Sequence, residues 1–227
     1  MTTLKSEGRC LYCGQLYDKR SIGKHLDAHL AQFSTGTTGP GTMALHVRVE
    51  AAEMFLELLI DANATLTRVD EFLRKIWLEC CGHLSAFRPK GTYDEIPMSR
   101  RAGTVFSPGS VFDYEYDFGS TTALQIKVGK AFSISASNDI VLLSRNEPLQ
   151  VLCRVCAAKS ATQICSVHLW EDTGLFCDGC AEKHAKTCED FADYAQMPVV
   201  NSPRMGVCGY EGGIIDTERD GVFAVKT

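Results

Sequence analysis

The chain has 227 residues, 45% of them apolar, and a formal net charge of −5 at pH 7. This length allows one domain of ordinary size together with one or two small modules. No apolar run approaches the roughly 20 residues of a membrane span, and the N-terminus lacks a signal-peptide core, which argues against a membrane-spanning helix and against export. We therefore expect a soluble, cytoplasmic protein.

Cysteine spacing and charge distribution indicate the compartment and the place of any phosphate-binding surface. Eight of the eleven cysteines stand at Cys-x-x-Cys-type spacings with histidines, which is typical of metal thiolates in a reducing compartment. Residues 1–42 carry five basic and three acidic side chains, residues 43–150 eleven and fourteen, and residues 151–227 seven and eleven. Because only the first segment is net positive, we expect any phosphate-binding surface to lie there.

The stretch "CLYCGQLYDKRSIGKHLDAHL" is the first motif along the chain. Two residues separate Cys10 from Cys13, three separate His25 from His29, and eleven lie between the pairs. This spacing resembles the Cys-Cys-His-His zinc finger, one residue short of its usual inner spacing. A module of residues 1–34 buries too little apolar surface to fold alone, so metal binding and folding are expected to be one equilibrium.

Four polar residues lie at or near the start of the finger's predicted helix, namely Lys19, Arg20, Ser21 and Lys24. In a finger that reads DNA this end of the helix enters the major groove. The three basic side chains are therefore candidate phosphate contacts, and Ser21 is a candidate base contact. One finger covers only about three base pairs, and a solvated basic face or a protein-docking surface is the alternative interpretation.

A Gly, Thr and Pro stretch over residues 35–42 predicts a linker to a core domain at residues 43–150. Helical periodicity predicts an amphipathic helix over residues 65–81, with Thr65 or Thr67 as its N-cap. Alternation of apolar residues predicts a strand at 44–50, and further strands are predicted at 54–60, 83–89, in a hairpin over 110–130, and at 139–145. Strands, then a helix, then more strands indicate an α+β fold with a mainly antiparallel sheet and a covering helix.

Three stretches of this sequence, "CCGHLSAF", "FDYEYDFGS" and "MPVVNSPRMGVCGY", resemble the plasmid pRiA open-reading-frame-three family. The resemblance covers roughly residues 43–145, and the cysteine-rich tail is similar to a longer subset of that family. It implies an α+β core and a mobile-element or defence context, and no particular activity. In the family an acid and a tryptophan usually follow Asp-Phe-Gly; Ser120 and Thr121 stand here, so any role of that acid is lost.

Strand alternation in "FDYEYDF" places three carboxylates on one face and the aromatic residues, including Phe118, on the other. Three carboxylates could hold Mg²⁺ or act as acid and base, which makes a metal-dependent phosphodiester hydrolase the alternative function. The residues of that candidate site would be Asp113, Glu115, Asp117 and His83. The other interpretation is a solvated face balanced by Lys127 and Lys130, with His83 hydrogen-bonded in a corner.

Residues 153–188 contain four further pairs of donors: Cys153 with Cys156, Cys165 with His168, Cys177 with Cys180, and His184 with Cys188. Eight donors suit two tetrahedral zinc ions. The spacing resembles a B-box-like cross-braced module, in which the first and third pairs share one ion and the second and fourth share the other. Sequential pairing remains open, as does a single ion at the first and third pairs. Because the sets are rich in thiolates and complete, we interpret them as structural.

Four residues outside these motifs are assigned to solvent or to the core. His46 lies on the polar side of the first core strand and is expected to face solvent. Cys80 and Cys81 end the predicted helix and are expected in the core, and Cys208 lies in "MGVCGY" as a packed thiol, with a reactive thiol as the alternative. The catalytic candidates are therefore limited to the acidic strand and His83.

The predicted architecture is a finger at 1–34, a linker at 35–42, a core at 43–150, a zinc module at 151–192 and an extended segment at 193–227 that packs on the core. Three zinc ions are expected, or two if the second cluster holds one. The predicted function is that of an adaptor whose finger contacts nucleic acid and whose acidic C-terminal half contacts protein. No membrane partner is expected, and the question of enzymatic activity stays open, with a non-enzymatic role favoured.

Overall fold

The computed structural model of the chain describes residues 6–34, 43–134 and 136–219. These residues form two compact units, and each is described by itself. Of the described residues, the sheet unit comprises 6–34, 43–74, 83–134 and 136–147, and the cysteine-rich unit comprises 75–82 and 148–219. The predicted linker at 35–42 lies outside the described residues.

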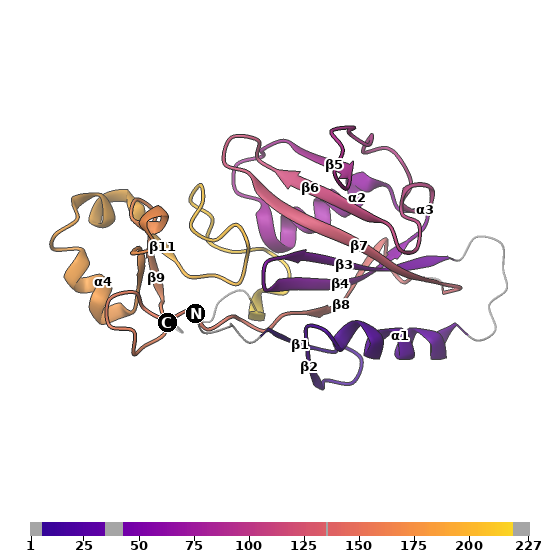
Figure 1. Cartoon of the computed structure of the whole chain (residues 1–227), viewed down its shortest axis with the longest axis horizontal. Coiled ribbons are helices and arrows are strands. Elements are labelled where there is room, and N and C mark those ends of the chain that lie inside the picture. Colours follow the sequence, from indigo (N-terminus) through magenta and orange to yellow (C-terminus); the bar gives the residue numbers. More distant parts are fainter. Residues whose placement is uncertain (1–5, 35–42, 135, 220–227) are drawn as a thin grey trace. The chain divides into compact units, whose positions relative to one another are not determined.

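The sheet unit is built on a six-stranded sheet in the order β5-β6-β7-β3-β4-β8, in which every neighbouring pair is antiparallel (Figure 1). The predicted α+β class with a mainly antiparallel sheet is confirmed. Its elements in chain order are β1 (Glu7–Arg9), β2 (Leu16–Asp18), α1 (Ile22–Phe33), β3 (Ala44–Ala51), β4 (Met54–Asp61), α2 (Leu66–Leu73), β5 (Ser85–Pro89), α3 (Ala102–Val105), β6 (Val111–Tyr116), β7 (Thr122–Phe132) and β8 (Ile140–Arg145).

Two predicted boundaries change. The helix predicted to reach residue 81 is shorter. The α-helix α2 ends at Leu73, and the π-helix η1 (Arg74–Leu78) continues it to Leu78. Strand β6 ends at Tyr116, since Asp117 adopts a left-handed backbone with φ +64°. That turn breaks the alternation, so Phe118, predicted on the aromatic face, is 48% exposed. Elsewhere alternation places the strands within a residue or two of their predicted ends.

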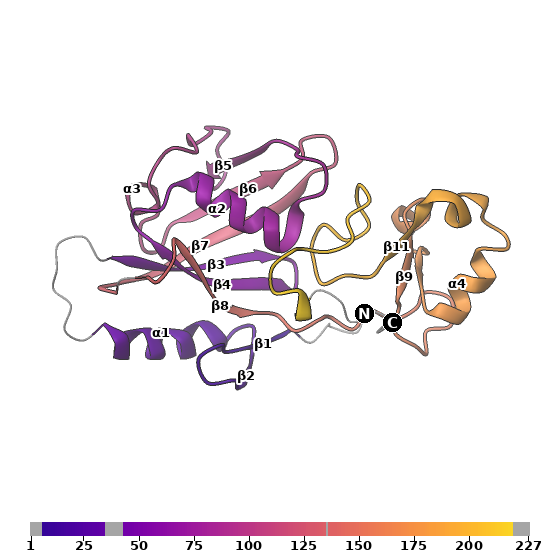
Figure 2. The same cartoon turned by 180° about the vertical axis from the view of Figure 1, so that it is seen from behind.

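One face of the sheet packs on α2, which lies in front of the sheet in Figure 2 and behind it in Figure 1. The Tyr114 hydroxyl of β6 donates to Oδ1 of Asp70 on α2 at 2.7 Å. Burial and the carboxylate of Asp70 raise the pKa of Tyr114. Buried residues of the other strands lie on the same face of the sheet as Tyr114, among them Leu124, Ile126, Val47, Val49, Leu56 and Leu58.

The opposite face packs on α1, the helix of the finger. Ile22, Leu26 and Leu30 recur at every fourth position and are fully buried. They form one apolar cluster with sheet residues Ala44, Phe55, Leu59, Phe132 and Leu143. The finger is therefore part of the same hydrophobic core as the sheet, and Figures 1 and 2 both show α1 running beside β8.

The cysteine-rich unit has very short regular elements, held around a three-stranded sheet in the order β10-β9-β11. They are β9 (Gln163–Cys165), η2 (Leu169–Glu171), β10 (Leu175–Phe176), α4 (Asp178–His184), η3 (Phe191–Ala195), β11 (Gln196–Pro198) and η4 (Thr217–Arg219). The tail after β11 packs on residues 75–78 of the same unit: Ser202 Oγ donates to the Trp77 carbonyl at 2.6 Å, and the Ile214 amide donates to the Lys75 carbonyl at 2.7 Å. Among the described residues no helix combines the length and apolar character needed to cross a bilayer.

A buried charged group joins the finger helix to the sheet. His46, expected to face solvent, is only 5% exposed because α1 covers its side of β3. Its Nδ1 lies 2.7 Å from Oδ1 of Asp27 on α1, and its Nε2 lies 3.0 Å from Oε2 of the buried Glu57 on β4. Arg48 also pairs with Glu57, and Lys130 lies 3.0 Å from Asp27. Burial alone would lower the pKa of His46, but the two carboxylates outweigh it and raise the pKa to about 9.

The folded state should lose stability as His46 loses its proton. Because the folded pKa of about 9 exceeds the ordinary value of 6.5, the stabilisation is complete below about pH 6.5 and disappears as pH rises through 9. The free energy of unfolding in urea should fall by roughly 3 kcal/mol over that range. In His46→Gln this decline should be absent, whereas the surface control Glu95→Gln should keep it. An equal decline in both variants would contradict the assignment.

Candidate metal centres

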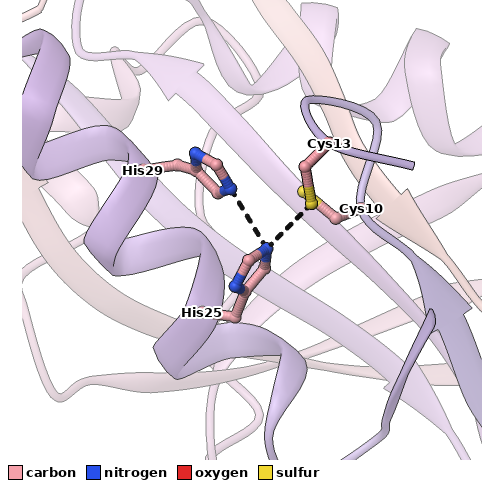
Figure 3. A group of neighbouring side chains, drawn as sticks. All are labelled: Cys10, Cys13, His25 and His29. Carbon is pink, nitrogen blue, oxygen red and sulfur yellow. Dashed lines mark hydrogen bonds between the residues drawn. The ribbon is translucent and has the colours of Figure 1, made fainter. Parts of the chain in front are cut away.

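The finger places four donors at one point (Figure 3). Cys10 and Cys13 come from the turn between β1 and β2, and His25 and His29 lie one helical turn apart on α1. Their ligand atoms lie within 4.8 Å of one another; Cys13 Sγ is 3.3 Å from His25 Nε2, which is 3.1 Å from His29 Nε2. A tetrahedral zinc ion spaces sulfur and nitrogen ligands about 3.3 to 3.8 Å apart, so the set fits zinc.

The local sequence explains this arrangement. Gly14 has φ +74° and lets its amide donate to the Cys10 carbonyl at 2.8 Å, which closes the turn that holds both thiols. The Tyr17 ring stacks on His25 with centroids 3.9 Å apart. Burial lowers the pKa of His25, which favours the neutral imidazole that binds a metal.

The second cluster divides into two sets of four donors in the cysteine-rich unit. The first set joins Cys153 and Cys156 to Cys177 and Cys180, with ligand atoms within 4.8 Å of one another. Cys156 Sγ lies 3.8 Å from Cys177 Sγ, the spacing of two thiolates on one tetrahedral zinc. Burial would raise the pKa of Cys153, but backbone amides of Cys156 and Cys177 donate to it and lower the pKa to about 6. The neighbouring Cys177 thiol and burial raise the pKa of Cys180 to about 12.

The second set joins Cys165 and His168 to His184 and Cys188, again within 4.8 Å of one another. His168 Nδ1 lies 3.2 Å from Cys165 Sγ and 4.0 Å from Cys188 Sγ. His184, at the end of α4, stacks on Phe176 with centroids 4.4 Å apart, and burial lowers its pKa. Of the pairings that the spacing left open, the structure therefore brings the first pair to the third and the second pair to the fourth.

The finger's basic residues have unequal surroundings. Arg20 and Lys24 are exposed. The ammonium group of Lys19 binds the Ala52 carbonyl between β3 and β4. Ser21 Oγ donates to Oδ2 of Asp18 at 2.8 Å, which stabilises the turn before α1. Of the four predicted nucleic-acid contacts, Arg20 and Lys24 are therefore exposed, whereas Lys19 and Ser21 have partners within the protein.

The acidic strand does not assemble a metal site. Among the described residues, no group of donor atoms gathered within 4.8 Å contains its carboxylates. Glu115 pairs with Arg88, and Oδ2 of Asp113 accepts from the Gly91 amide at 3.3 Å. The predicted balance by two lysines is wrong, because Lys127 pairs with Glu50 on β3 and Lys130 pairs with Asp27 on α1.

Asp117 has a structural role at the end of β6. It is buried, and its Oδ1 accepts from the amides of Gly119 at 3.0 Å and Ser120 at 3.2 Å. Nδ1 of His83 lies 3.6 Å from that same oxygen. The carboxylate thus holds the β6–β7 turn, as in an Asx turn, and His83 lies beside a carboxylate that is already engaged.

One group of thiols is missed by sequence reasoning. Cys80, Cys81 and Cys208 have their sulfur atoms within 4.8 Å of one another, although 127 residues separate the last two. Cys81 and Cys208 are exposed, so the prediction of buried packing roles for them is wrong. A glycine follows each of these two cysteines, as in a metal-binding turn, and this was the available signal.

Comparisons with known proteins give no functional assignment. No protein-family model matches the chain, and no curated protein matches it. A solved structure with some likeness is that of a protein of unknown function from Methanosarcina mazei Go1. It is 12% identical, the alignment covers 45% of this chain and 67% of that chain, and the TM-score is 0.38.

The cross-braced pairing predicts how double substitutions remove metal. Cys153→Ser/Cys177→Ser changes one set, so it should release one ion, whereas Cys153→Ser/Cys165→Ser changes both sets and should release two. Native mass spectrometry of the zinc-loaded chain measures the difference, with the finger's ion as an internal reference and Ser166→Ala as a control that keeps every ion. A larger loss from the first double variant than from the second would support sequential pairing instead.

Proposed function

We propose that this chain is a zinc-stabilised binding protein and not an enzyme. The observation that carries the proposal is the completeness of the donor sets: each of the three predicted sets supplies four Cys or His ligand atoms at one point. Thiolate and imidazole donors suit zinc, and four protein ligands leave no position for a reactive water. The metals on this account fix the fold, and function resides in the surfaces that the fold presents.

The proposed nucleic-acid contact is the outer side of α1. The apolar side of the helix packs on the core, and Gly23 and Asp27 lie against the charged group around His46. The remaining side of the helix faces outward and carries Lys24, and the exposed Arg20 lies in the turn just before the helix. These cations lie at the helix start, where a finger approaches the phosphate backbone, so we assign them as the contacts. With two contacts, binding would be weak and indifferent to sequence.

Fluorescence anisotropy of the zinc-loaded chain against random duplex DNA, single-stranded DNA and RNA tests this contact. Binding should weaken with salt at a log–log slope of about −2 for duplex DNA, because each neutralised phosphate contributes about −0.9. Arg20→Ala/Lys24→Ala should abolish the slope. The matched control Lys90→Ala/Arg101→Ala removes two exposed cations elsewhere on the sheet unit and should bind as the wild type does.

Equal loss of binding in the test and control variants would show general charge attraction and contradict the assignment to α1. No binding by the wild-type chain at low salt would reject nucleic acid as the ligand. Zinc content must be the same in all three proteins, so that a lost finger is not mistaken for a lost contact.

The proposed protein contact is on the acidic half. Residues 151–227 carry eleven acidic and seven basic side chains, which disfavours phosphate ligands. Trp170 lies on η2, between the donors His168 and His184 in the sequence, and its side chain is 81% exposed. Exposed tryptophans often anchor protein interfaces. Photo-crosslinking from position 170 tests this contact, and a crosslinking pattern identical to that from position 186 would reject it.

The hydrolase alternative has no comparable support, since Asp113, Glu115 and Asp117 each have a local partner. Membership in the plasmid pRiA open-reading-frame-three family, with a mobile-element or defence context, stays a proposal based on the sequence stretches quoted above.

A further inference from the structure

Three cysteines of the cysteine-rich unit form a group outside the predicted zinc sets. The sulfur atoms of Cys80, Cys81 and Cys208 lie within 4.8 Å of one another. Sγ of Cys81 is 3.6 Å from Sγ of Cys208, close to the 3.8 Å between Cys156 and Cys177 in the first cross-braced set. Two thiolates on a tetrahedral zinc lie about 3.8 Å apart, so the spacing is that of shared ligands.

The backbone around these cysteines is shaped to present them. Cys208 has φ +54°, an uncommon conformation for a residue with a side chain, and it lies between Gly206 at φ +78° and Gly209 at φ +67°. Hydrogen bonds from the Val207 amide to Arg204 and from the Tyr210 amide to Val207 hold this turn. Gly82, at φ +73°, follows Cys81 in the same way. A non-glycine residue held in this region often marks a functional position.

A buried cation acts on the same group. Arg204 is fully buried, and its Nη2 donates to the sulfur of Cys80 at 3.5 Å. This contact fixes the position of the Cys80 sulfur within the group. Close approach of the Cys208 thiol raises the pKa of Cys81 to about 11. A divalent cation among the three sulfurs would reverse that effect, because it deprotonates a coordinating thiol.

We infer that Cys80, Cys81 and Cys208 bind a further zinc ion through their three thiolates. These supply three of the four ligands that a tetrahedral zinc ion takes. The ion would join residues 75–82 to the turn around Cys208 across 127 residues of chain, and it would raise the expected number of ions from three to four.

Native mass spectrometry of the full-length chain, purified with zinc and a reductant, tests this inference. The wild-type chain should hold four zinc ions, and Cys81→Ser/Cys208→Ser should hold three. Val207→Ser, a matched control beside Cys208, should hold four. The three ions that stay in the double variant show that the rest of the fold is intact.

Cobalt substitution gives a second readout. The four sites together contain eleven sulfur ligands, and the further site contains three of them. In cobalt-loaded Cys81→Ser/Cys208→Ser the thiolate-to-cobalt absorption should therefore fall by about that fraction of the wild-type value. An unchanged ion count in Cys81→Ser/Cys208→Ser would overturn the inference. So would a Cys81–Cys208 disulfide that persists in the reduced, zinc-saturated chain, because it would identify the pair as a redox couple. Neither result depends on nucleic-acid binding by α1.

Discussion

Cys and His metal donors that are far apart in the sequence lie close together in the structure. The folding of the finger and of the cysteine-rich unit depends on the metal ions that these donors can bind. The strands of the cysteine-rich unit are only two or three residues long, and its buried clusters around Ile164 and Phe176 are small. Such a unit cannot offset the entropy of ordering its chain by apolar burial alone. Structural zinc supplies on the order of 10–16 kcal/mol of apparent binding free energy, which is enough to decide whether it folds.

The finger relies on both kinds of support. Its donors form one metal set, while Ile22, Leu26 and Leu30 enter the core of the sheet unit. Docking also buries an ionic group, in which His46 of β3 bridges Asp27 of α1 and Glu57 of β4. Because removing one partner of a buried ionic group leaves a charge unpaired, this contact specifies how α1 lies on the sheet. The orientation in turn determines which side of the helix can meet a ligand.

Local patterns predict much of this structure, because they depend on neighbouring residues. Alternation of apolar residues finds β3 and β4 nearly to the residue, and close Cys and His pairs identify twelve of the donors. The burial of His46 could not be predicted, since the polar side of β3 becomes an interior surface only when α1 docks on it.

Contacts across long sequence separations escape the same reasoning. The pairs Lys127–Glu50 and Lys130–Asp27 follow from the register of β7 on β3 and from the docking of α1, neither of which a single strand reveals. Cys208 lies 127 residues from Cys81, and the four residues on either side of it in the sequence include no other cysteine and no histidine. Glycine turns at both positions were the one sign in the sequence that these thiols have a common role.

Amide hydrogen exchange before and after complete metal removal tests the dependence on convergent donors most directly. Chelation should abolish protection in residues 153–198 and weaken it in residues 7–33, whose helix is also held by apolar packing, while strands β3, β4 and β7 of the sheet should stay protected. Undiminished protection of residues 153–198 in a chain shown to contain no metal would contradict the account.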